Sequence, residues 1–129
     1  MDSFVCDTQA LVKFMMGKKV INNKAHQAFL AADKGEAVII IPAIVLMEVL
    51  YLFEKHRIDI DLLQTEDLLE SHNYQIEPLG LEIRKTASEI DDIPELHDRL
   101  IAATARYLDL PLITNDPEIQ ASAFVKILQ

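Results

Sequence analysis

The segment Ala37-Val38-Ile39-Ile40-Ile41 most strongly restricts what this chain can fold into. It is β-branched at nearly every position and shows no alternation of polar and apolar side chains. Strands that are buried on both faces have this pattern, and they occur mainly in parallel sheets covered by helices on both sides. The segment therefore predicts a buried strand that ends at Pro42, within an α/β fold.

The rest of the chain alternates between short apolar runs and stretches of helical periodicity. Further strands are expected at 4–6, 74–79, 110–113 and 123–128. Helices are expected to begin near residue 10 and to cover 18–34, 43–53, 59–71, 81–90 and 95–108, with Asp92 as the N-cap and Pro94 as the first helical residue of the last one. This order predicts a three-layer α/β/α sandwich with a central parallel sheet of four or five strands, and one domain over 1–129.

Composition limits the class of protein. Half of the 129 residues are hydrophobic, so a sizeable core is expected. No apolar run approaches the roughly 18 residues needed to span a bilayer, and the first residues lack the basic region of a signal peptide. The single cysteine, Cys6, sits in an apolar run and is expected to be buried. These features predict a cytoplasmic protein.

A net charge of −9 argues at first against a nucleic-acid partner, because phosphate groups favour basic surfaces. The argument is weak if several carboxylates surround a cation that offsets their charge. The basic residues are also clustered. One group lies between Lys13 and Lys24, and a second is Lys55-His56-Arg57.

Two acidic residues follow apolar runs that are expected to be strands. Asp7 comes after Phe4-Val5-Cys6, and Asp116 comes two residues after Leu112-Ile113-Thr114. In α/β sheets, ligands bind outside the carboxyl ends of the strands. Both residues are equally consistent with helix N-caps, and Pro117 at the first helical position supports that interpretation for Asp116.

Two further acids lie on helices with apolar faces. Glu48 is the only charged residue within 43–53, and Ile44 and Leu52 share its helix face. An unpaired buried carboxylate is costly, so Glu48 must line a cleft, be protonated, pair with a cation such as Lys55 or Arg57, or be exposed at a helix edge. Asp98 lies three and four positions before Ile101 and Ala102, at or beside the buried face of its helix. Alternatively, it is a first-turn acid favoured by the helix dipole.

In the predicted sheet these four carboxylates are expected to meet at one edge. They would repel one another unless a divalent cation binds. A set of oxygen ligands without paired His or Cys favours Mg²⁺ or Mn²⁺ over zinc. A cation held there could polarise a phosphodiester.

The order Phe4-Val5-Cys6-Asp7-Thr8, then Glu48 in an apolar helix, then the block from His97 to Asp116 resembles the PIN-domain family. The chain looks most like toxin ribonucleases of the VapC type. This resemblance covers essentially the whole chain, and the block from Asp98 to Asp116 is its specific part. It implies an α/β/α sandwich and a single-strand ribonuclease that depends on Mg²⁺ or Mn²⁺.

The resemblance also implies roles for particular residues and partners. Asp7, Glu48, Asp98 and Asp116 match the acidic metal-binding residues of the family, and Thr114 matches its hydroxyl beside the site. A homodimer and an antitoxin protein are the implied partners. Arg99 and Lys13 are the expected phosphate contacts, and Thr8 is expected to hydrogen-bond to a carboxylate or to the phosphate.

Two other classes remain open. One is a PIN-like interaction module with little catalysis, although all four acids are intact. The other is a receiver-like phosphotransfer domain, which would require a lysine after a late strand. Thr114 and Asp116 stand there instead of a lysine.

Overall fold

The structure, a computed structural model, describes residues 1–20 and 22–129. The described part contains a four-stranded parallel sheet in the order β3-β2-β1-β4. Its strands are β1 (Asp2–Cys6), β2 (Ala37–Pro42), β3 (Tyr74–Glu77) and β4 (Leu112–Ile113). The helices are α1 (Thr8–Met15), α2 (Asn23–Asp33), α3 (Ala43–Glu54), α4 (Leu62–Leu69), α5 (Leu81–Glu89), α6 (Leu96–Leu108) and α7 (Pro117–Gln120).

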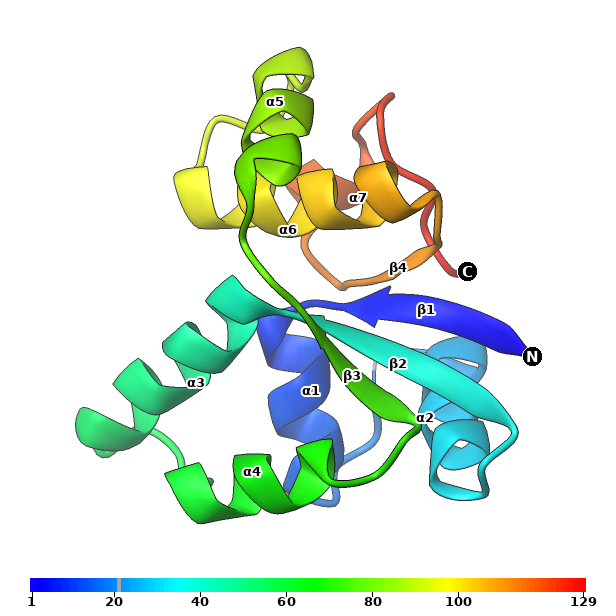
Figure 1. Ribbon diagram of the computed structural model, residues 1–129, viewed down its shortest axis with the longest axis vertical. Coiled ribbons are helices and arrows are strands. Elements are labelled where there is room, and N and C mark those ends of the chain that lie inside the picture. Colours follow the sequence, from blue (N-terminus) through cyan, green and yellow to red (C-terminus); the bar gives the residue numbers. More distant parts are fainter. Residues whose placement is uncertain (21) are drawn as a thin grey trace.

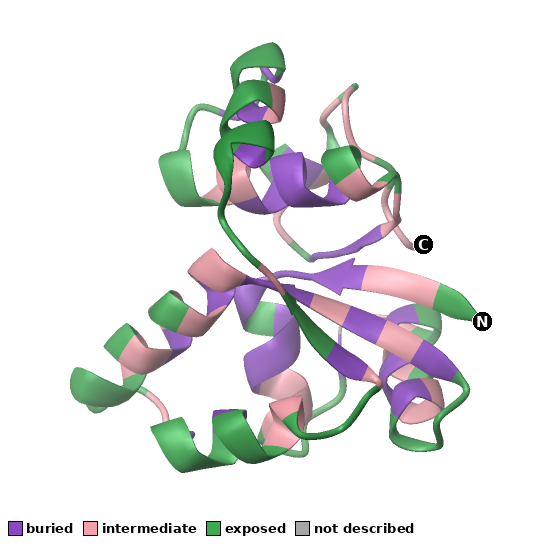
Figure 2. Cartoon of the chain, viewed as in Figure 1, coloured by how far each residue is buried: buried purple, intermediate pink, exposed green. Residues whose placement is uncertain are grey.

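The predicted α/β/α fold with a parallel sheet is confirmed. Figure 1 shows α5 and α6 on one side of the sheet and α1, α2 and α4 on the other, while α3 leads away from the end of β2. The β-branched segment forms β2 and pairs with β1 on one side, where Phe4 faces Ile39, and with β3 on the other. In Figure 2, β1 is purple only at its carboxyl end, where Val5 and Cys6 are buried and pair with β4, and β4 is buried over both of its residues.

One continuous hydrophobic core joins the two helical layers through the sheet. Phe29 of α2, Ile39 of β2 and Ile101 of α6 are among its most fully buried side chains. Cys6 is buried and unpaired, as expected. Within the described residues, no helix has the length and apolar character required to cross a membrane.

Two predicted helices are shorter than expected. The helix predicted over 18–34 begins only at Asn23, because the Asn22 side chain accepts a hydrogen bond from the Ala25 N–H and caps it. Residue 21 of that range lies outside the described residues. The helix predicted over 59–71 covers only Leu62–Leu69, since Asp61 and Gln64 form a reciprocal capping box at its start.

The predicted start of α6 is wrong. Glu95, rather than Asp92, is the N-cap, and its carboxylate accepts a 2.6 Å hydrogen bond from the Asp98 N–H. Asp92 is used elsewhere, because its two oxygens accept hydrogen bonds from the Ser122 hydroxyl and the Ala123 N–H. These bonds also lower the pKa of Asp92 below its usual value.

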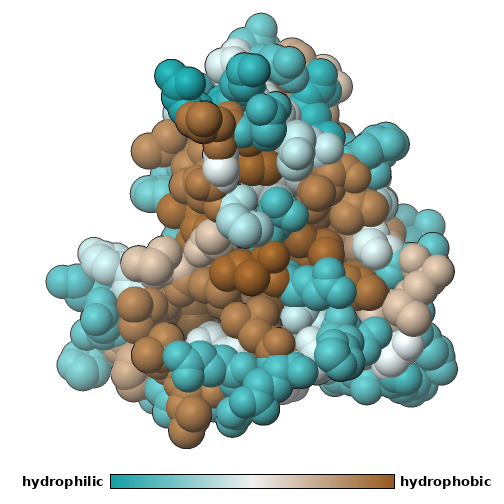
Figure 3. Space-filling view, in the orientation of Figure 1, coloured by the Kyte–Doolittle hydropathy of each residue, from teal (hydrophilic) through white to brown (hydrophobic). Residues whose placement is uncertain are grey.

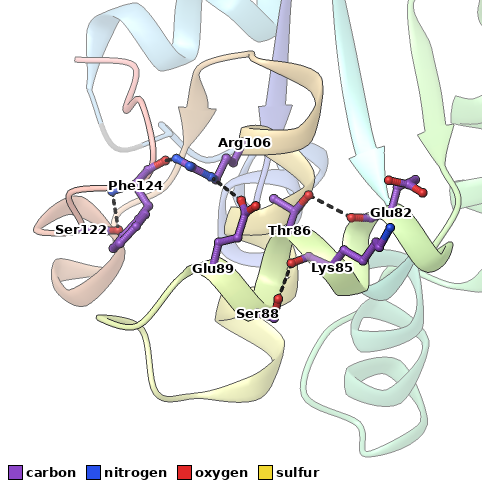
Figure 4. A network of polar contacts seen from close by, with 8 residues as sticks. All are labelled: Glu82, Lys85, Thr86, Ser88, Glu89, Arg106, Ser122 and Phe124. Carbon is purple, nitrogen blue, oxygen red and sulfur yellow. Dashed lines mark hydrogen bonds and ion pairs between the residues drawn. The ribbon is translucent and has the colours of Figure 1, made fainter.

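The strand predicted over 123–128 is also wrong. The segment makes an isolated parallel bridge between Ile127 and Leu112 of β4, not a strand. Side-chain contacts hold this segment in place in addition to the short backbone pairing. Arg106 of α6 donates to the Phe124 carbonyl oxygen and contacts Glu89 of α5, and its guanidinium lies over the Phe124 ring (Figure 4).

Candidate active site

Asp7 is placed by the end of β1 and the start of α1. It is the N-cap of α1, and its Oδ1 accepts a 2.9 Å hydrogen bond from the Ala10 N–H. Its side chain is nevertheless close to other acids rather than isolated among apolar groups. The capping interpretation and the strand-end interpretation of Asp7 therefore both hold.

Asp116 is placed in the same way by β4 and α7. It is the N-cap of α7, with Pro117 at the first helical position, and its Oδ1 accepts from the N–H groups of Glu118 and Ile119. The Asp116 N–H donates to Thr114 Oγ1, which leaves the Thr114 hydroxyl proton for Asp7. Thr114 is buried and thus connects the Asp116 backbone to the Asp7 carboxylate.

Asp98 is the third residue of α6, one turn after the cap at Glu95. The Glu95 carboxylate has two tasks, because one oxygen accepts from the Asp98 N–H and the other lies 2.9 Å from His97 Nδ1. These two partners, together with the position at a helix start, lower the pKa of Glu95. Both oxygens of Glu95 are thus bound to groups at the start of α6, whereas the Asp98 carboxylate lines the cleft.

Glu48 is half-buried in the second turn of α3, which starts directly after β2. Its Oε1 accepts a 2.5 Å hydrogen bond from the buried Thr8 hydroxyl of α1. Among the described residues, no cation forms an ion pair with Glu48, so the salt bridge considered from the sequence is not made. The Thr8 hydroxyl of α1 stabilises the carboxylate instead.

All four acids line one cleft with a volume of about 790 Å³. Its lining residues follow the carboxyl ends of β1 and β4 or lie on α1, α3 and α6, so the cleft lies at the edge of the sheet where β1 and β4 end. Thr8 and Lys13 also line it, whereas Thr114 reaches it through its hydrogen bond to Asp7. Arg99 is directed elsewhere, because it donates to the carbonyl oxygens of Ile93 and Pro94.

The acids act on one another electrostatically. Burial, followed by the neighbouring charges of Asp116, Glu95, Glu48 and Asp7, raises the pKa of Asp98 from 3.8 to about 6. Burial also raises the pKa of Asp7, with additional contributions from Asp116 and Glu48, although hydrogen bonds from Thr114 and the Ala10 N–H oppose the shift. Proton affinity above the ordinary range is what a cluster of carboxylates without a counter-charge should show.

The donor set fits a hard divalent cation. It consists of carboxylate oxygens supported by hydroxyl groups, with no cysteine and with His97 turned towards Glu95 through Nδ1. In the described part of the chain, no three acids or histidines converge tightly enough to hold an ion without moving.

The sequence did not identify the rest of the cleft wall. Ile44, Met47, Tyr51 and Leu52 of α3 line it, together with His97 of α6 and Asn115, which lies between β4 and α7. A signal for the α3 residues was present, because they share helical spacing with Glu48.

A parallel α/β sheet with an acidic cleft at the carboxyl edge of its strands defines the class of protein. The sequence profile of the PIN domain matches residues 4–125, so the chain belongs to the PIN domain family. A comparison with curated protein sequences gave no match.

Solved structures of toxin–antitoxin proteins share this fold. The chain is similar to a chain of VapBC2 from Rickettsia felis, solved with a DNA fragment from its promoter, at 18% identity and a TM-score of 0.73 (98% of this chain and 97% of the other). It is similar to a chain of a Klebsiella pneumoniae toxin–antitoxin complex at 20% identity and a TM-score of 0.63 (97% and 95%). The Mycobacterium tuberculosis toxin VapC20, which cleaves the sarcin–ricin loop, matches at 15% identity and a TM-score of 0.67 (98% and 99%).

Proposed function

We propose that this chain is a divalent-metal-dependent endoribonuclease that hydrolyses single-stranded RNA. The observation that carries the proposal is that Asp7, Glu48, Asp98 and Asp116 line the same cleft in a chain of the PIN domain family. Raised proton affinity at Asp7 and Asp98 supports it, because a bound cation would relieve the same repulsion that protons relieve.

The chain's own residues would have distinct tasks in this reaction. Asp7 and Asp98 would hold Mg²⁺ or Mn²⁺ most directly, and Asp116 and Glu48 would complete the ligand set. A bound cation of this kind supplies Lewis-acid stabilisation of charge on the phosphate and the leaving oxygen. Thr114 would keep the Asp7 carboxylate oriented, Thr8 would do the same for Glu48, and Lys13 is positioned to contact a phosphate.

Metal-dependent cleavage is the direct test. Purified protein should cleave a labelled single-stranded RNA in the presence of Mg²⁺ or Mn²⁺, and EDTA should abolish cleavage. The variant Asp98→Asn should remain folded, because the side chains are nearly isosteric, and should lose activity. Cleavage by Asp98→Asn at the parental rate under saturating metal would show that the reaction does not use this cleft.

We further propose that the protein is the cytoplasmic toxin of a toxin–antitoxin pair, forms a homodimer and consists of one domain over 1–129. The toxin–antitoxin complexes with the same fold support the antitoxin partner, and the continuous core supports the single domain. Co-expression with the protein encoded by a neighbouring gene should yield a stable complex. Light scattering that finds only monomer at working concentrations would contradict the homodimer.

The alternative proposal is a PIN-like module that binds partners but hardly cleaves RNA. The four acids in one cleft favour the enzyme. Binding of a partner protein together with no cleavage at saturating Mg²⁺ or Mn²⁺ would instead favour the module.

A further inference from the structure

The α3 wall of the cleft extends well beyond its acidic end. Ile44, Met47, Glu48, Tyr51 and Leu52 line the cleft, and their spacing of three and four places them on one helix face. Glu48 is the only charged residue among these five. Met47 and Tyr51 are 59% and 53% exposed, so both are open to an incoming molecule. Figure 3 shows apolar side chains gathered on the side of the molecule formed by α3, β3 and α4.

A cation lies beside the apolar wall, at the C-cap of α3. Lys55 comes seven residues after Glu48, and its Nζ lies 5.5 Å from the centre of the Tyr51 ring. With a rise of about 1.5 Å per residue, Tyr51 lies about 4.5 Å and Lys55 about 10.5 Å beyond Glu48 along the helix axis. The helix thus presents an acid, an aromatic ring and a cation in that order. Lys13 of α1 is a cation that lines the cleft itself.

This order matches the chemistry of a single-stranded polynucleotide. Proteins that bind single strands combine aromatic rings, on which bases stack, with cations that follow the phosphates. The acids and a divalent cation would occupy only one end of the 790 Å³ cleft. A strand whose scissile phosphate lies at the acids must place its neighbouring nucleotide along one of the cleft walls, and α3 offers the aromatic one.

We propose that Glu48, Tyr51 and Lys55 mark an RNA track along α3, in which Tyr51 stacks against the base next to the scissile phosphate and Lys55 pairs with the following phosphate. This inference rests on the proposed ribonuclease function and assigns a substrate-binding role to residues outside the acidic set. It also gives a role to the basic group at Lys55, which the acidic site does not use.

Binding measurements test the stacking contact separately from catalysis. Fluorescence anisotropy of a labelled single-stranded RNA is measured with Mg²⁺ in an Asp98→Asn background, and gels verify that the RNA stays intact. Adding Tyr51→Ala should weaken binding roughly 5- to 150-fold, while Tyr51→Phe should retain it. The matched control is Tyr107→Ala, because Tyr107 is a similarly exposed tyrosine (47%) that lies on α6 outside this cleft.

An abasic RNA identifies the base as the partner of Tyr51. Removing the base next to the scissile position should weaken RNA binding by the protein that keeps Tyr51. It should not further weaken RNA binding by the Tyr51→Ala variant. Lys55→Gln should lower the slope of log affinity against log salt by about 0.7, as loss of one phosphate contact on a single strand does. Lys85→Gln on α5 is its control and should leave the slope unchanged.

The outcomes separate the two proposals. If the parent protein cleaves RNA but Tyr51→Ala binds it as tightly as the control does, the track is wrong while the ribonuclease stands. That result would leave this helix face to a protein partner. If the protein neither cleaves nor binds RNA, the track and the proposed function are both wrong.

Discussion

At the scale of single residues, three of the four cleft acids also stabilise helix starts. Asp7 and Asp116 accept backbone N–H groups as N-caps, and Asp98 stands in the first turn of α6. The positive end of a helix dipole favours negative charge at such positions. This explains how the fold tolerates these charges close together, although not without raising the proton affinity of Asp7 and Asp98.

The raised pKa of Asp98 predicts how stability depends on pH without metal. The folded-state pKa of about 6 exceeds the ordinary value of 3.8, so the folded protein binds more protons between these values than the unfolded chain does. The contribution of Asp98 to stability therefore falls as pH rises from 3.8 to about 6. Asp98→Asn should flatten this dependence and raise stability at pH 7 by about 1 kcal/mol, since solvent screens a partly exposed carboxylate.

Urea unfolding in EDTA at a series of pH values measures this effect. Asp59→Asn is the matched control, because Asp59 is an exposed acid outside the cleft. A parallel stability–pH curve for Asp98→Asn and the parent protein would contradict the assignment.

The Thr8 hydroxyl is predicted to matter through Glu48. Thr8→Val keeps the shape of the side chain but removes the 2.5 Å hydrogen bond to a half-buried carboxylate. The free energy of unfolding at pH 7 should fall by about 1.5–3 kcal/mol, as for other hydrogen bonds to charged groups. Thr8→Ser should restore most of it. Equal unfolding midpoints for the valine and serine variants would show that the hydroxyl contributes nothing.

At the scale of elements, Asp116 allows its capping role to be separated from its charge. Asparagine caps helices about as well as aspartate, whereas alanine does not. Asp116→Asn should therefore keep the stability of the parent protein, and Asp116→Ala should lose about 1 kcal/mol. Both should lose RNA cleavage. Thermal unfolding and cleavage assays on the two variants check this, and an active Asp116→Asn would remove Asp116 from the proposed site.

The same elements show how far sequence reasoning reaches. β2 was predictable because a run of four β-branched residues, Val38 to Ile41, has few alternative environments, and α6 because its apolar face is regular. The segment 123–128 was not predictable, because its apolar residues suit a strand while contacts from Arg106 and Asp92, distant in sequence, set its path. Asp92 was wrongly predicted to cap α6 for the same reason, because its actual partners, Ser122 and Ala123, are distant in sequence.

The candidate site divides in the same way. Acids at strand ends were visible because the ends of parallel strands meet at one edge of a sheet. The α3 wall of the cleft was not predicted, because apolar residues at helical spacing usually belong to the core. Only the tertiary structure shows that this helix face is open.

At the scale of the whole molecule, binding of a divalent cation should stabilise the fold. The proposed ligands come from α1, α3, α6 and the segment before α7, so a cation would connect parts of both helical layers. At a metal concentration 100-fold above the dissociation constant, mass action adds about 2.7 kcal/mol. Thermal unfolding should shift upwards with Mn²⁺ or Mg²⁺ in the parent protein and much less in Asp7→Asn. Equal shifts in both proteins would place the cation elsewhere.

The sheet order also has a consequence for synthesis. β1 lies between β2 and β4, and β4 follows it by most of the chain. A ribosome therefore releases Asp7, Thr8 and Glu48 long before it releases Asp98 and Asp116. Because β4 and α7 position the last acid, the nascent polypeptide cannot assemble the complete set of four carboxylates until translation is almost finished. A nuclease built in this way would stay inactive towards nearby RNA while it is still being made.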